Sequence, residues 1–100
     1  MAIYGNFLDQ AGVCKSGVVD CQTTATPIRV DKHTNLSSRH AVVVTAPAGA
    51  TLYIGDSKVT SASGIPVVAG DTLIIPATSS NDIYMAASKA CKVPVTEMSR

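Results

Sequence analysis

The stretch that decides the fold begins with Leu52-Tyr53-Ile54-Gly55-Asp56-Ser57-Lys58-Val59-Thr60. It continues through Gly64-Ile65-Pro66-Val67-Val68, Thr72-Leu73-Ile74-Ile75-Pro76 and Ile83-Tyr84-Met85-Ala86. Short apolar and β-branched runs alternate here with Gly, Pro, Ser and Asp. This alternation is typical of antiparallel strands joined by short turns. The stretch contains no reactive set of side chains, so it predicts a fold rather than a chemistry.

The rest of the chain continues the same pattern, and we predict further strands over residues 17–22, 23–30, 40–46 and 91–97. The strand at 40–46 is predicted to be central, because apolar residues occupy both of its faces. It is also predicted to form a hairpin with residues 51–54 through the turn at 47–50. Pro27 and Pro94 lack a backbone N–H, so we expect their strands to lie at sheet edges.

No amphipathic helical period is present, and the fold class expected is all-β. We predict an antiparallel β-sandwich or jelly-roll-like barrel with an extended N-terminal arm. The predicted domains are an arm at residues 1–16 and a single β-sandwich domain at residues 17–100. The arm is interpreted either as a frayed terminus or as a segment that packs on a neighbouring chain. Its candidate interaction residues are Ile3, Tyr4, Phe7 and Leu8.

Composition excludes several classes of protein. Hydrophobic residues make up 46% of the chain and charged residues 15%, which favours a folded core over disorder. The net charge is +1, and the eight Lys and Arg residues are scattered rather than gathered in a basic stripe. We interpret them as surface charges and expect no nucleic-acid partner. No apolar run is long enough for a membrane span, and no membrane partner is expected.

The first residues lack the pattern of a signal peptide, so we expect the protein to be made in a cytosol. The default state of Cys14, Cys21 and Cys91 is then a free thiol. Their spacing is not that of a metal knuckle. Cys21 and Cys91 fall in the first and last predicted core strands, so they are candidates for neighbours in space.

The two histidines, His33 and His40, allow a catalytic triad or a metal site to be considered. Asp31, Ser37 and Ser38 lie near them in the sequence. Sequence neighbours do not make a triad, and the chain has no Gly-x-Ser-x-Gly elbow. We therefore predict no catalytic residues, no cofactor and no metal site, and we interpret the histidines as loop and strand-edge residues.

A succession of motifs runs from residue 21 to residue 98. It comprises a Thr-rich strand, a small-residue loop ending in a basic residue, a hydrophobic strand, a Tyr-Ile-Gly signature, a Gly-x-Pro, an Ala-Gly-acidic turn and two closing strands. These motifs are Thr23–Pro27, Leu36–Arg39, Ala41–Thr45, Leu52–Thr60, Gly64–Pro66, Ala69–Leu73, Ile83–Ala87 and Val93–Glu97. This order resembles a family of small β-sandwich proteins of tailed bacteriophage virions. Asp56 stands where a second Gly is usual, and Asp71 replaces a Glu; both fit turns.

The resemblance implies a virion structural protein without catalysis, made in the host bacterial cytoplasm and located in the virion. Among virion parts we expect a capsid decoration or cement protein that binds the assembled head through the major capsid protein. A head-fibre base or a tail or head-tail component is the alternative within the virion. The resemblance also favours a homo-oligomer, with a trimer expected. A β-sandwich module that binds carbohydrate or protein is the second function class, although few aromatic residues are present.

Overall fold

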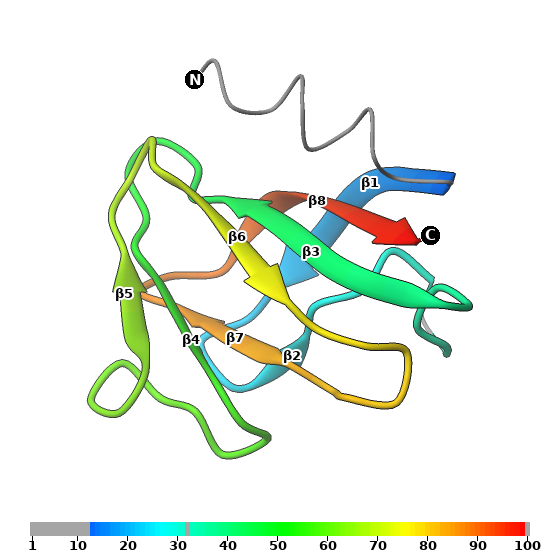
Figure 1. Cartoon of the computed structure of the whole chain (residues 1–100). Helices are drawn as coiled ribbons and strands as arrows, with labels where there is room; N and C mark the ends of the chain where they lie inside the picture. Colours follow the sequence, from blue (N-terminus) through cyan, green and yellow to red (C-terminus); the bar gives the residue numbers. More distant parts are fainter. Residues whose placement is uncertain (1–12, 32, 100) are drawn as a thin grey trace.

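The computed structural model describes residues 13–31 and 33–99, and over these residues it consists of β-strands and their connections (Figure 1). No helix occurs within this part of the chain, as predicted. The strands are β1 (Val13–Cys21), β2 (Thr26–Pro27), β3 (Arg39–Thr45), β4 (Leu52–Gly55), β5 (Ile65–Val67), β6 (Thr72–Pro76), β7 (Tyr84–Ala87) and β8 (Cys91–Ser99).

The strands form two four-stranded sheets with the orders β1-β8-β3-β6 and β2-β7-β4-β5. Every pairing is antiparallel, so the predicted antiparallel all-β class is confirmed. The pairing is nested: β1 pairs with β8, β2 with β7, β3 with β6 and β4 with β5. The chain therefore folds back on itself around the β4–β5 connection. The β3–β8 pairing joins two of these strand pairs into the first sheet, and the β4–β7 pairing joins the other two into the second.

The two sheets share one core, to which each contributes alternate residues of its strands. Val42 and Val44 point inward from β3, and Leu52 and Ile54 point inward from β4. Because side chains alternate across a strand, one face of each sheet supplies the core and the other faces outward. Each fully buried Val, Leu or Ile stabilises the fold by about 1.5–3 kcal/mol. The remaining core residues are Cys21, Ile28, Ala46, Val67, Met85, Ala87, Val93 and Val95.

The predicted hairpin between residues 40–46 and 51–54 is wrong. β3 lies in the first sheet and β4 in the second, so the intervening turn carries the chain from one sheet to the other. Ala46 N donates to Asp71 O at 2.9 Å, which ties this turn to the β5–β6 turn. Both strands bury one face, and an alternating pattern is the same whether two strands lie side by side or face each other across a core.

The two prolines give opposite outcomes. Pro27 lies in β2, an edge strand, as predicted. Pro94 lies in β8, between β1 and β3, so its predicted edge position is wrong. The ladder between β3 and β8 ends at the pair Val44 and Val95. Pro94 therefore needs a partner only on the β1 side, where it lies opposite Val18. The proline is tolerated because one ladder stops before reaching it.

Strand boundaries differ from the predictions at the start of the domain. β1 begins at Val13 rather than at residue 17, and the run predicted over 23–30 narrows to the two residues of β2. Gly17 therefore lies inside β1 rather than at its start. Glycine suits this position because a Cβ there would lie 2.7 Å from Val30 Cγ1. The arm residues Ile3, Tyr4, Phe7 and Leu8 lie outside the described residues.

Candidate functional site

Arg39 is not the surface charge that the sequence predicted. Its side chain and that of Glu97 are both 0% exposed, and Arg39 Nη1 lies 3.0 Å from Glu97 Oε2. β3 contributes the arginine and β8 the glutamate. The alternation that buries Val93 and Val95 continues to Glu97, which points the carboxylate inward. A buried charge is tolerated only when it is paired and hydrogen-bonded.

The Arg39 guanidinium uses all of its N–H groups. Nη1 also donates to Ile28 O at 3.2 Å, and Nη2 donates to Thr78 O at 3.0 Å and Asn81 O at 2.7 Å. Nε lies 3.3 Å from Ala77 O and 3.2 Å from Thr78 O, and so shares its proton between them. Five donors in a fixed fork match this set of carbonyls. One side chain thereby fixes the connection between β6 and β7.

The Glu97 carboxylate fixes the connection between β2 and β3. Val30 N donates to Oε1 at 2.7 Å, and Leu36 N donates to Oε2 at 3.0 Å. Asn35 Nδ2 then bridges the two connections, donating to Ser79 O at 2.9 Å and to Asp82 Oδ1 at 2.8 Å. Irregular loops are thus held in one arrangement by buried charge and by hydrogen bonds.

We call the connections β2–β3 (28–38), β4–β5 (56–64) and β6–β7 (77–83) the loop end. Because successive strands run in opposite directions, these three connections all follow even-numbered strands and belong to one end of the strand order. The loops Ser61–Gly64 and Thr78–Asn81 both belong to it. Residues 61–63 and 78–81 are exposed. A surface that is ordered before binding loses less entropy when a partner docks.

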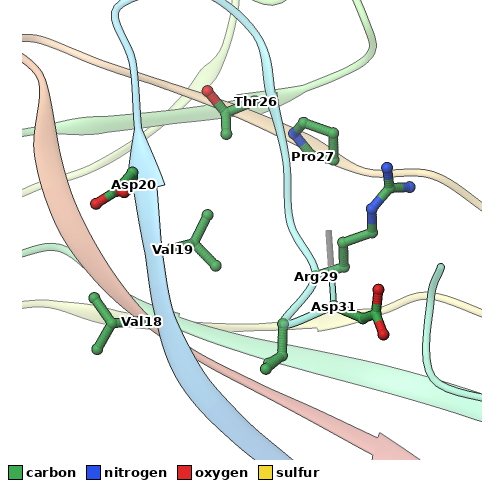
Figure 2. A pocket seen from close by; sticks show the side chains of 8 residues that line it. Val18, Val19, Asp20, Thr26, Pro27, Arg29 and Asp31 are labelled. Carbon is green, nitrogen blue, oxygen red and sulfur yellow. The ribbon is translucent and has the colours of Figure 1, made fainter. Parts of the chain in front are cut away.

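A groove of about 230 Å³ lies between β1 and residues 26–31 (Figure 2). In Figure 2, Val19 on β1 points toward Pro27 and Arg29 on the opposite side. Asp31 is at the rim, where Lys15 Nζ lies 3.8 Å from its Oδ2. The His33 backbone N–H donates to Asp31 Oδ1 and, with Lys15, lowers the pKa of this carboxyl. The groove therefore combines an apolar floor with charged edges.

Large apolar side chains are exposed at both edges of the molecule. Val18, on edge strand β1, is 65% exposed. Ile65, on edge strand β5, is 65% exposed, and Val68 just beyond it is 54% exposed. The two strands are edges of different sheets and lie on opposite sides of the molecule (Figure 1). Such side chains at an edge are candidate contacts with other chains.

The residues weighed for a triad lie at the loop end. His33, Ser37 and Ser38 are exposed, and His40 is half-buried on β3. The Asp31 carboxylate pairs with Lys15 and accepts a hydrogen bond from the backbone N–H of His33, so it has partners other than a histidine side chain. Within residues 13–31 and 33–99, no three His, Cys, Asp or Glu side chains gather as a metal site would require.

The cysteines carry free thiols, as predicted. Cys21 and Cys91 are direct partners in the β1–β8 register, which confirms that they are neighbours. Cys21 is buried and its Sγ lies 3.8 Å from Met85 O. Burial and the adjacent Cys91 raise the pKa of Cys21 from 9.0 to about 11, and burial also raises the pKa of Cys91. Cys14 is exposed.

Among the described residues there is no helix with the length and apolar character to cross a membrane. Comparisons with family models, with curated proteins and with solved structures find no match to this chain. The chemistry of the described residues and the topology of the sheets therefore carry the functional argument.

Proposed function

We propose that this protein is a non-enzymatic structural component of a tailed-phage virion, and that it decorates the outside of the assembled head. The observation that carries the proposal is the nested pairing of eight strands. A chain paired in this way and split between two packed sheets has the connectivity of a jelly roll, a β-sandwich architecture common in viral capsid and lectin domains. The motif order of residues 21–98 supports the same class.

The loop end is both exposed and held in place by hydrogen bonds, which supports a role for it in docking to another protein. The loop end presents exposed loops, and the Arg39–Glu97 pair holds two of its three connections in place. No substrate or cofactor needs to be invoked for such a surface. We propose that the loop end contacts the major capsid protein, because its exposed loops are polar, small and ordered in advance.

The two exposed edges support a closed homo-oligomer, for which we favour a trimer. Val18 on β1 and, on the other side, Ile65 and Val68 offer two different sets of exposed apolar side chains. When such unlike surfaces of successive copies meet, the interface is head-to-tail, and it closes into a ring if the rotation allows. A ring of three presents three loop ends to the shell, and linked contacts raise avidity by about 10²–10⁴-fold. The arm residues Ile3, Tyr4, Phe7 and Leu8 remain proposed contacts as well.

The direct test is to mix purified protein with phage heads that lack it and to sediment them at low and high salt. Co-sedimentation with heads is expected under both conditions, because the proposed contacts are mostly uncharged and salt screens exposed charges. A variant with Ser79→Glu and Ser80→Glu should lose binding while keeping its β spectrum. A Ser88→Glu variant, at the opposite end of the sheets, is the control. Recovery only with tails, or with neither part, would overturn the proposal.

One observation favours carbohydrate binding as a second candidate. Tyr53 and Tyr84 lie on the outer face of the second sheet, since Leu52, Ile54 and Met85 point inward. Tyr53 is opposite Ala86, so Tyr84 is its diagonal neighbour, about 7–8 Å away. Two aromatic rings at this spacing form a small platform for a sugar. A glycan array separates the candidates: binding abolished by Tyr53→Ala and Tyr84→Ala would favour the second.

A further inference from the structure

Cys21 and Cys91 lie directly opposite each other on neighbouring antiparallel strands. Directly opposed Cα atoms in such a pair are about 4.5 or 5.5 Å apart, depending on the type of pair. Disulfides span Cα separations of about 4.4–6.8 Å, so either type of pair is compatible. Opposed residues also share a face of the sheet. Both side chains point toward the core, where Cys21 is buried and Cys91 packs against its edge.

We propose that Cys21 and Cys91 are a modification site, at which a small-molecule disulfide such as oxidised glutathione converts the two thiols into a cross-strand disulfide between β1 and β8. The inference does not depend on the proposed function. Only the folded chain selects this pairing, because folding brings together residues at opposite ends of the domain.

The reaction proceeds by two thiol–disulfide exchanges. Cys91 is the more accessible of the two, so its thiolate attacks one sulfur of oxidised glutathione and releases one glutathione thiolate. The Cys21 thiolate then attacks Cys91 Sγ and expels the second glutathione. The protein loses two hydrogen atoms, and one oxidised glutathione becomes two reduced ones. Burial raises the pKa of both thiols, so the reaction is slow at neutral pH and faster at alkaline pH.

The disulfide would link β1 to β8, which are the first and last strands of the nested pairing. Within residues 13–31 and 33–99, β1 is an edge strand whose one neighbour is β8. A link from Cys21 to Cys91 closes a loop that contains most of the domain, and long loops gain the most from closure. The protein would then fold with free thiols inside a reducing cell and become more stable after release into an oxidising medium.

The test uses a Cys14→Ser variant, so that the exposed thiol does not react. The folded protein is incubated with oxidised glutathione at roughly pH 9, where thiolates form. Remaining thiols are then blocked with N-ethylmaleimide in urea, and the protein is digested with trypsin without a reductant. Residues 16–29 and 90–92 are expected as one disulfide-linked product, with the loss of two hydrogen atoms. The thermal midpoint is expected to rise by roughly 10 °C or more, and dithiothreitol should reverse the rise.

Two single-thiol variants serve as controls. Cys14→Ser with Cys21→Ser should accumulate a glutathione adduct on Cys91, while Cys14→Ser with Cys91→Ser should stay unmodified because Cys21 is buried. Three results would overturn the proposal. These are a stable adduct on Cys91 in the protein that retains Cys21, a disulfide that forms only in urea, or a disulfide that lowers the thermal midpoint.

Discussion

At the scale of single residues, Arg39 and Glu97 contribute more than any other polar pair to the order of the described structure. The chain contains a natural comparison, because Lys92 Nζ and Asp20 Oδ1 form an ion pair of nearly the same length, 2.9 Å against 3.0 Å. The Lys92 and Asp20 side chains are 76% and 71% exposed, whereas Arg39 and Glu97 are fully buried. The two ion pairs therefore have nearly the same length and differ in burial.

Replacing Arg39 with Met should lower the free energy of unfolding by about 3–5 kcal/mol, because Glu97 would remain buried without its partner charge. Lys92→Met should lower the free energy of unfolding far less than Arg39→Met, since an exposed pair is solvated and screened. Urea denaturation of the two variants measures both values. Equal costs would contradict the role assigned to the buried pair.

The pKa of Cys21 gives a prediction for alkaline pH. The folded value, about 11, lies above the ordinary value of 9.0, so the folded state holds this proton more tightly. The stability contributed by the protonated thiol is complete below pH 9 and is lost as the pH rises through 11. The loss should reach about 3 kcal/mol.

Denaturant unfolding of reduced protein across this pH range measures the loss, with Cys21→Ala as the comparison. The variant starts from a lower stability, but its stability should decline less steeply with pH. Parallel curves for the two proteins would show that the Cys21 proton is not the cause.

At the scale of strands, the sequence predicted most of the elements but not their partners. β4 to β8 fall close to the predicted runs, because turn residues mark their ends and β-branched residues fill them. Pairing depends on contacts between residues far apart in the chain, which explains the wrong hairpin and the misplaced Pro94. The buried Arg39 was also missed: charge predicts exposure, and only the continued Val93-x-Val95-x-Glu97 alternation indicated an inward carboxylate.

Gly17 allows Val30 to pack closely against β1, because a Cβ at this position would lie 2.7 Å from Val30 Cγ1. Gly17→Ala should therefore cost about 1–3 kcal/mol through overpacking. In a Val30→Ala background the same change should be nearly neutral, since the colliding methyl group is absent. A double-mutant cycle by thermal unfolding measures this coupling. Equal costs in both backgrounds would mean that Gly17 is needed for another reason.

At the scale of the whole molecule, exposed apolar side chains lie on or beside the edge strands β1 and β5, which are on opposite sides of the structure (Figure 1). If copies associate head-to-tail through these edges, changing either edge should have the same effect. Val18→Lys and Ile65→Lys should each reduce the assembly to single chains, while mixing the two variants should give no closed ring. Ser16→Lys, on the same outward face of β1, is the control for added charge.

Light scattering measures the assembled mass, and three times the mass of one chain is expected for the unchanged protein. A single chain at all concentrations would contradict the ring. Loss of assembly after deletion of residues 1–12, with both edge variants unaffected, would assign the contact to the arm instead.

We propose that this all-β protein is a multi-copy part on the outside of a phage head. A difference map between electron-microscopy reconstructions of particles with and without the protein tests this most directly. We expect added density on the outer surface of the head, repeated at three-fold positions, with the loop end facing the shell. Added density confined to the tail, or two indistinguishable maps, would contradict it.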